Sequence, residues 1–374
     1  MVEKKRILLI GNCYTTVAGF REELIIGLVK SGMEVYIAFP NHSHGELESG
    51  RNFAEKTGCH YIEIKMNRRS SNLLKEVGAI THINKLIADV KPDCVLLFTI
   101  KPNIYGGILC QIKKIPYIIN ITGRGSGLNQ GALRILLSRL YVRSMNKAYR
   151  VFFQNRNDYQ YFINAGYKRG TETFVPGSGV NLEKYAVLPY PNSDCVNILY
   201  TARVMKEKGI DEFIGAAKAF EKDKNVTFEI CGDCEEDYLD ELTDLDKKEI
   251  IKYNGRVSDV RPYIAESACV VIPTFYHEGV SNCLLEAAAC ARPIITTNLP
   301  GSAETVEDGV TGYLIKEKDI DELVKSIRSF INLSIEDRRK MGLAGRIKVE
   351  KEFDRRFVVD KYLNEIRNIL GIST

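Results

Sequence analysis

The segment 273–286 combines an apolar run, a loop and the start of a helical pattern in an order that suits phosphate binding. The loop carries Glu278 and Gly279, and a helix is predicted to begin near Ser281 or Asn282, because both are favoured N-cap types. The first N–H groups of a helix lack an intrahelical acceptor, and the helix dipole adds partial positive charge there. Gly279 would let a ligand approach the backbone without a Cβ in the way. The segment therefore predicts a seat for a diphosphate.

Glu286 lies one helical turn after Asn282, on the same face of the predicted helix. A carboxylate at that position can accept two hydroxyl hydrogen bonds, as the diol of a ribose would offer. Local capping or ion pairing of Glu286 is the structural alternative. We expect Glu286 to bind a ribose. We expect the backbone of Gly279 and of the segment Val280–Asn282 to bind the diphosphate.

Several motifs in the second half of the chain resemble the retaining glycosyltransferases of family 4, which have the GT-B fold. They are the two glutamates seven residues apart, Glu278 and Glu286, and the segments 287–293, 301–304 and 308–314. The resemblance implies an α/β protein with two Rossmann-like domains that face each other across a cleft. It also implies transfer of a sugar from a nucleotide-diphosphate donor, with retention of the anomeric configuration.

The segment 201–209 is similar to the family segment that supplies an arginine and a lysine to the donor diphosphate. These map onto Arg203 and Lys208, and Glu278 would contact hydroxyls of the transferred sugar. Two fixed cations and helix amides can stabilise the charge that develops on a leaving diphosphate. Arg203, Lys208 and Glu278 are the predicted catalytic residues. No carboxylate cluster of metal-binding type is evident, so we expect neither a metal nor another cofactor.

The same resemblance places the nucleotide base near Gly232 and near the backbone of Arg256 or Val257. Strand-end glycines are common, so this part of the resemblance is less specific.

Segments 98–107 and 119–125 resemble a narrower group, bacterial enzymes that extend undecaprenyl-diphosphate-linked or capsular saccharides. Several members use UDP-N-acetylgalactosamine or UDP-galactose. Lys101, Thr122 and Gly123 are the substrate-binding residues that this resemblance suggests. Many family members carry a histidine near the position of Thr122, which is not present here, so no general base is assigned. In such enzymes the donor phosphate itself is thought to help deprotonate the acceptor.

The elements that must position these residues alternate between continuous apolar strands and amphipathic helices, which is typical of a parallel sheet covered on both faces. The alternation breaks near residue 185 and then restarts. We predict an acceptor-binding domain over 1–185, a nucleotide-sugar-binding domain over 186–354, and a final helix over 355–374 that crosses back to the first domain. Gly11 and Gly19, in the loop after the first strand, are expected to face the substrates.

Charge divides the chain into two unlike parts. Residues 1–182 carry a net charge of +12 and the remainder −8. The basic half, with an amphipathic basic helix over 131–147, is consistent with contact with an anionic membrane surface, although an ordinary surface helix explains that pattern equally well. Neither a signal peptide nor a membrane span is predicted, and the scattered cysteines suggest free thiols. We expect a cytoplasmic protein that contacts the inner face of the plasma membrane.

Three other functions compete with that of a glycosyltransferase that uses a UDP-sugar and a lipid-linked or oligosaccharide acceptor. An NAD-dependent oxidoreductase would need G-x-G-x-x-G after the first strand, where the sequence has Gly11-Asn-Cys-Tyr. A nucleic-acid binder is disfavoured by the acidic second half and the lack of a recognised module. A nucleotide-sugar epimerase of the same architecture remains the alternative, and analysis of the products separates the two.

Overall fold

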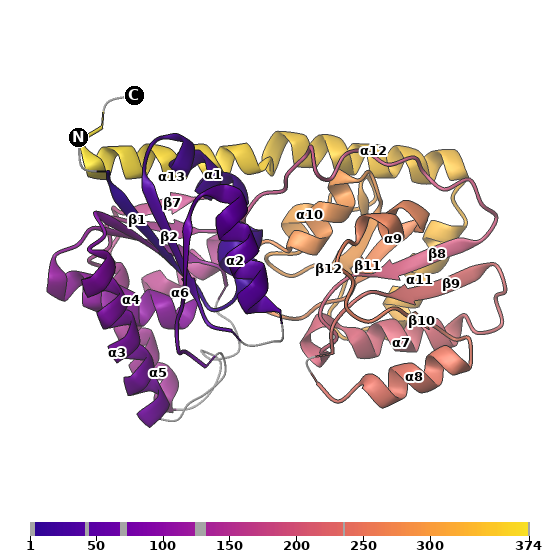
Figure 1. Ribbon diagram of the computed structural model, residues 1–374. Coiled ribbons are helices and arrows are strands. Elements are labelled where there is room, and N and C mark those ends of the chain that lie inside the picture. Colours follow the sequence, from indigo (N-terminus) through magenta and orange to yellow (C-terminus); the bar gives the residue numbers. More distant parts are fainter. Residues whose placement is uncertain (1–3, 42–44, 68–72, 124–131, 235, 373–374) are drawn as a thin grey trace. The chain divides into compact units, whose positions relative to one another are not determined.

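The computed structural model describes residues 4–41, 45–67, 73–123, 132–234 and 236–372, and it divides into two compact units. The first unit is Met1–Ser178 with Arg356–Thr374, and the second is Gly179–Arg355. Each unit contains one parallel sheet with helices against it (Figure 1).

The first unit has a seven-stranded parallel sheet in the order β3-β2-β1-β4-β5-β6-β7. Its strands are β1 (Arg6–Ile10), β2 (Glu34–Phe39), β3 (His60–Glu63), β4 (Cys94–Phe98), β5 (Tyr117–Ile121), β6 (Arg150–Phe153) and β7 (Glu172–Phe174). Its helices are α1 (Glu22–Lys30), α2 (Glu46–Thr57), α3 (Leu73–Val90), α4 (Ile100–Lys113), α5 (Ala132–Met145), α6 (Arg156–Asn164) and α13 (Arg355–Leu370), with a π-helical turn at Thr15–Gly19.

The central strands of this sheet are buried on both faces, which explains their continuous apolar sequences. Leu8 and Ile10 pack into one core with side chains of α3, α4 and α5. Ile7 and Leu9 point to the opposite face, where α1, α2 and α13 supply the other half of the packing. Successive strand side chains alternate between faces, so a single apolar strand serves two cores.

The second unit has a six-stranded parallel sheet in the order β10-β9-β8-β11-β12-β13. Its strands are β8 (Val196–Tyr200), β9 (Val226–Ile230), β10 (Lys252–Tyr253), β11 (Cys269–Ile272), β12 (Ile294–Thr297) and β13 (Gly312–Ile315). Its helices are α7 (Ile210–Ala219), α8 (Leu239–Lys247), α9 (Arg261–Glu266), α10 (Asn282–Ala289), α11 (Ile320–Ile331) and α12 (Ile335–Glu352), with 3₁₀ turns at Lys206–Lys208 and Ala303–Thr305.

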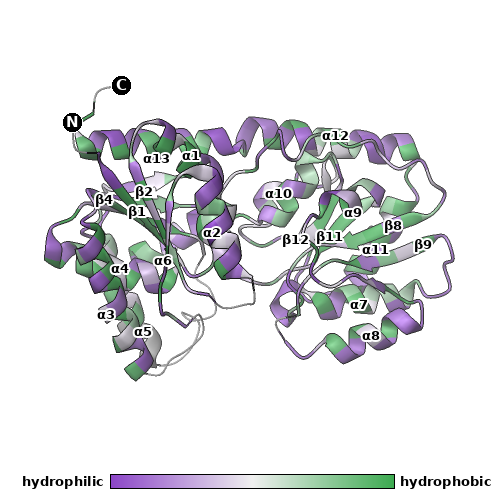
Figure 2. Ribbon diagram, viewed as in Figure 1, coloured by the Kyte–Doolittle hydropathy of each residue, from purple (hydrophilic) through white to green (hydrophobic). Residues whose placement is uncertain are grey.

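Hydropathy follows this architecture. In Figure 2 the central strands β8 and β11 are mostly hydrophobic, whereas helices such as α11 alternate between hydrophobic and hydrophilic residues. Helix α11 buries Leu323, Ile327 and Phe330, spaced by three and four residues, and turns charged residues outward. Asp319 caps it by accepting a hydrogen bond from the N–H of Glu322.

Candidate functional site

The sheet order of the second unit places the predicted donor residues together. The strand order reverses between β8 and β11, and ligands of open α/β sheets bind at such a switch point, beyond the carboxyl ends of the strands. Arg203 and Lys208 lie in the loop that follows β8, and Glu278 lies in the loop that follows β11. Residues 70 positions apart in the sequence therefore become neighbours at one edge of the sheet.

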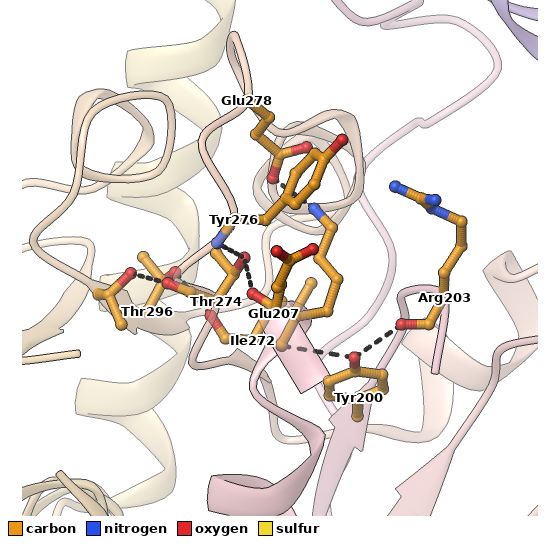
Figure 3. Close-up of polar contacts among 10 residues, drawn as sticks. Tyr200, Arg203, Glu207, Ile272, Thr274, Tyr276, Glu278 and Thr296 are labelled. Carbon is orange, nitrogen blue, oxygen red and sulfur yellow. Dashed lines mark hydrogen bonds and ion pairs between the residues drawn. The ribbon is translucent and has the colours of Figure 1, made fainter. Parts of the chain in front are cut away.

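Lys208 and Glu278 form an ion pair in this structure. The Nζ of Lys208 lies 2.5 Å from Oε1 of Glu278, and the two side chains are 7% and 19% exposed. An ammonium that is largely removed from water needs such a partner, because burial of an unpaired charge is costly. Arg203 is half-buried beside them. The site thus has two cations and one carboxylate within one small region (Figure 3).

Hydrogen bonds hold the two loops in place. The hydroxyl of the fully buried Tyr200 donates to the carbonyls of Arg203 and Lys208, at 3.0 and 3.4 Å. The carbonyl of Glu207 accepts a hydrogen bond from the N–H of Phe275, at 2.8 Å. Figure 3 shows the dashed line from the Tyr200 hydroxyl to the carbonyl of Arg203.

Gly209 closes the first of these loops with φ of +78°. A Cβ at that position would collide with the backbone of Pro273, so the close approach of the loops requires glycine.

Helix α10 begins at Asn282, with Ser281 as its N-cap. The side chain of Ser281 makes no capping hydrogen bond, so helix geometry leaves the N–H groups of Asn282, Cys283 and Leu284 without an intrahelical acceptor. The N–H of Ser281 differs, because it donates to the carbonyl of Gly301 at 2.9 Å. Among the amides expected to bind a diphosphate, that of Ser281 is therefore already engaged.

The residues around this helix start are packed closely. Gly279, Val280 and Ser281 are buried, and a Cβ at Gly301 would collide with the carbonyl of Gly279. Oδ1 of Asn282 is a buried acceptor without a hydrogen-bond partner within the described residues.

Glu286 projects from α10 one turn further on and contacts Tyr185, which lies in the chain just before the second sheet. Burial raises the pKa of Glu286 to about 7, while a hydrogen bond from the Tyr185 hydroxyl and the charge of Arg355 act in the opposite direction. The pKa of the Tyr185 hydroxyl is itself raised by burial and by the neighbouring carboxyl. Burial therefore favours the neutral form of Glu286 over its carboxylate.

The residues expected near the nucleotide base follow β9 and β10, at the same edge of the sheet. The N–H of Gly232 donates to the carbonyl of Gly255 at 2.8 Å, and a Cβ on Gly232 would collide with the carbonyl of Ala202. This glycine is explained by packing between strand-end loops, whatever its role in binding. Arg256 is exposed and Val257 is partly exposed.

The first unit brings its predicted substrate residues to one edge as well. Gly11, Lys101 and the pair Thr122 and Gly123 follow β1, β4 and β5, which are adjacent strands, and β1 and β4 flank the switch point of this sheet. Gly19 ends the π-helical turn after β1. Lys101 forms a 2.6 Å ion pair with Glu76.

Two residues of the donor region were not predicted from the sequence. Tyr276 lies beside Arg203 and Lys208, and Tyr185 contacts Glu286. The position of Tyr276, two residues before a candidate glutamate, was a usable signal. Tyr185 offered none, because its contact with Glu286 joins segments 101 residues apart.

Within the described residues, no group of three or more His, Cys, Asp or Glu side chains is arranged to hold a metal ion. None of the described helices is long and apolar enough to cross a membrane.

The chain has two Rossmann-like units, each with one parallel sheet, and the predicted donor residues lie at the switch point of the second sheet. These features define a GT-B fold. A solved structure of Anabaena Alr3699/HepE in complex with UDP-glucose has the same fold, with a TM-score of 0.77, 17% identity, and coverage of 97% of this chain and 99% of that one.

Family comparison agrees with the fold. Residues 195–332 match the family described as Glycosyl transferases group 1, and residues 6–155 match Glycosyl transferase 4-like. Together these matches cover most of the chain, and the protein belongs to these glycosyltransferases.

Two relatives are similar over long stretches. The N,N'-diacetylbacillosaminyl-diphospho-undecaprenol alpha-1,3-N-acetylgalactosaminyltransferase of Campylobacter jejuni is 23% identical over 96% of this chain and 97% of its own length. The UDP-Gal:alpha-D-GlcNAc-diphosphoundecaprenol alpha-1,3-galactosyltransferase of Escherichia coli is 23% identical over 69% and 71%.

Proposed function

We propose that this glycosyltransferase transfers a hexose or N-acetylhexosamine, with retention, from a UDP-sugar to a lipid-diphosphate-linked saccharide without a metal. The observation that carries the donor assignment is the grouping of Arg203, Lys208 and the first turn of α10 at the switch point of the second sheet. Two cations and a helix start suit a diphosphate, and Glu286 one turn further on suits a ribose diol. The UDP-glucose complex of the structural neighbour supports a uracil nucleotide.

In the proposed step, the bond between the anomeric carbon and the β-phosphate oxygen breaks and a bond from the acceptor oxygen to the same carbon forms. The acceptor hydroxyl gives its proton to the departing phosphate oxygen, so UDP leaves and no protein group changes protonation state. Arg203 and Lys208 stabilise the negative charge that develops on the diphosphate. Glu278 orients the sugar through its hydroxyls, once the diphosphate has taken over part of the interaction with Lys208.

The acceptor assignment depends on the relatives, whose names specify saccharides linked to undecaprenyl diphosphate. We place the acceptor at the strand-end edge of the first sheet, near Gly11, Thr122 and Gly123. The exposed Arg139 and Arg143 of α5 are suited to contact an anionic membrane surface, where such an acceptor resides.

The donor site is tested first by thermal-shift titration with UDP, GDP, ADP and NAD in the presence of EDTA. We expect UDP to raise the melting temperature of the wild type and to have a much smaller effect on Glu286→Ala. A response to GDP alone would change the donor, and a response to NAD alone would refute the donor site.

The reaction is tested by incubation with UDP-GalNAc or UDP-Gal and a short polyprenyl-diphosphate-linked saccharide, followed by NMR of the product. An α-linked product supports retention, and a β-linked product contradicts it. Formation of a free epimerised UDP-sugar would instead support an epimerase, which the family matches do not favour.

A further inference from the structure

The ring of Tyr276 lies beside both cations of the proposed donor site. The ring centroid is 5.7 Å from Cζ of Arg203 and 5.5 Å from Nζ of Lys208. Figure 3 shows the ring beside Glu278, with the Arg203 guanidinium on the other side of it. We propose that Tyr276 is a positioning residue that holds these two cations for the diphosphate of the donor. The inference depends on the proposed function, because it deepens the account of the same site.

The backbone of Tyr276 is fixed independently of its side chain. Its N–H donates to Oγ1 of Thr274 at 3.1 Å, and its carbonyl accepts from the N–H of Glu278 at 2.9 Å. Oγ1 of Thr274 donates in turn to the carbonyl of Glu207, in the loop that carries the cations. The ring is therefore held against Arg203 and Lys208 by main-chain contacts that a substitution of the side chain would preserve.

The positive charges of Arg203 and Lys208 repel each other. Before the donor binds, the site must nevertheless hold both side chains where the diphosphate will contact them. The face of an aromatic ring carries partial negative charge, so one ring can attract both cations without neutralising either. A carboxylate holds Lys208 more strongly, as Glu278 does, but it competes with the incoming diphosphate. The ring of Tyr276 attracts the cations without offering an anionic competitor for them.

The test compares the affinities of UDP and uridine for the wild type, Tyr276→Leu and Tyr276→Phe by titration calorimetry. Loss of the ring should weaken UDP binding by about three- to tenfold, the range expected for cation–π contacts in a partly buried site. The affinity of uridine should stay within about twofold, because uridine carries no phosphate. Tyr276→Phe keeps the ring and should retain the UDP affinity of the wild type.

Phe275→Leu is the matched control. Its ring lies 4.5 Å from Nζ of a different cation, Lys318, so the ratio of UDP to uridine affinity should not change. Equal losses of UDP and uridine affinity in Tyr276→Leu would show a structural role and overturn the inference, as would unchanged UDP affinity. Failure of the wild type to bind UDP would refute the proposed function instead.

Discussion

The charge of Glu286 is expected to make nucleotide binding depend on pH. Burial raises the pKa of this carboxyl to about 7, so the carboxylate that we propose to accept the ribose diol should form as pH rises through neutrality. A charged acceptor makes hydrogen bonds stronger than a neutral one by roughly 1.4 kcal/mol, or about tenfold in affinity. At pH 6 roughly nine-tenths of the carboxyls are protonated and at pH 8 roughly one-tenth, so affinity should rise about fivefold between the two.

Removal of the Tyr185 hydroxyl provides the perturbation. Tyr185→Phe deletes the hydrogen bond that lowers the pKa of Glu286, so the pKa should rise further. The pH at which UDP affinity is half-maximal should move upward by the same amount.

UDP affinity is measured by calorimetry from pH 6 to 8.5 and divided by that of Glu286→Gln at each pH. The division removes the titration of the phosphate, which is common to both proteins. A ratio that does not change with pH, or a Tyr185→Phe profile displaced to lower pH, would refute the reasoning.

Four further predictions concern turnover and stability. Glu286→Gln should raise the unfolding free energy by up to about 3 kcal/mol at pH 8, because the buried carboxylate is costly above its raised pKa, and most of this gain should vanish at pH 5 in thermal denaturation. Lys208→Ala should lower turnover by a factor of order 100, whereas Lys206→Ala, a mostly exposed neighbour, should change initial rates by less than about twofold. Gly301→Ala should weaken UDP binding and lower the melting temperature, because φ is +91° and a Cβ meets the loop before α10; wild-type values for both would contradict this. Arg292→Met should cost about 3–5 kcal/mol in chemical denaturation, because the fully buried guanidinium donates to several carbonyls, including those of Ile264 and Ala265.

The elements best predicted from the sequence are continuous apolar strands. The sequence predicts strands over 6–10, 117–121, 196–200 and 269–272, and β1, β5, β8 and β11 have these bounds, because each is a largely apolar segment buried on both faces. The sequence pattern predicts a helix over 105–113, whereas α4 begins earlier, at Ile100, because Pro102 is tolerated in the first turn of a helix. Helices α2, α8, α11 and α12 were not predicted from the sequence. The sequences of α2, α8 and α12 are largely polar, whereas α11 has a clear apolar stripe that was missed.

The residue types of the site could be predicted from the sequence, but the contacts between these residues could not. The start of α10 and the placement of Arg203 and Lys208 after a strand follow from local patterns. The pairing of Lys208 with Glu278 depends on which strands become neighbours, and sequence spacing carries no information about that. The hydrogen bond from the N–H of Ser281 to the carbonyl of Gly301 could not be predicted for the same reason.

The return of the C-terminal helix to the first unit affects the order in which the protein can fold during synthesis. Val358, Tyr362 and Ile366 of α13 pack in the same core as Phe98 and Phe152. The hydroxyl of Tyr362 also accepts a 2.7 Å hydrogen bond from a buried side chain of β5. Domains generally fold as they leave the ribosome, from the N-terminus onward.

Here one face of the first sheet lacks the part of its cover that α13 supplies until this helix emerges, whereas all residues of the second unit, 179–355, have been synthesised by then. The unit that is translated first is therefore the last to be completed.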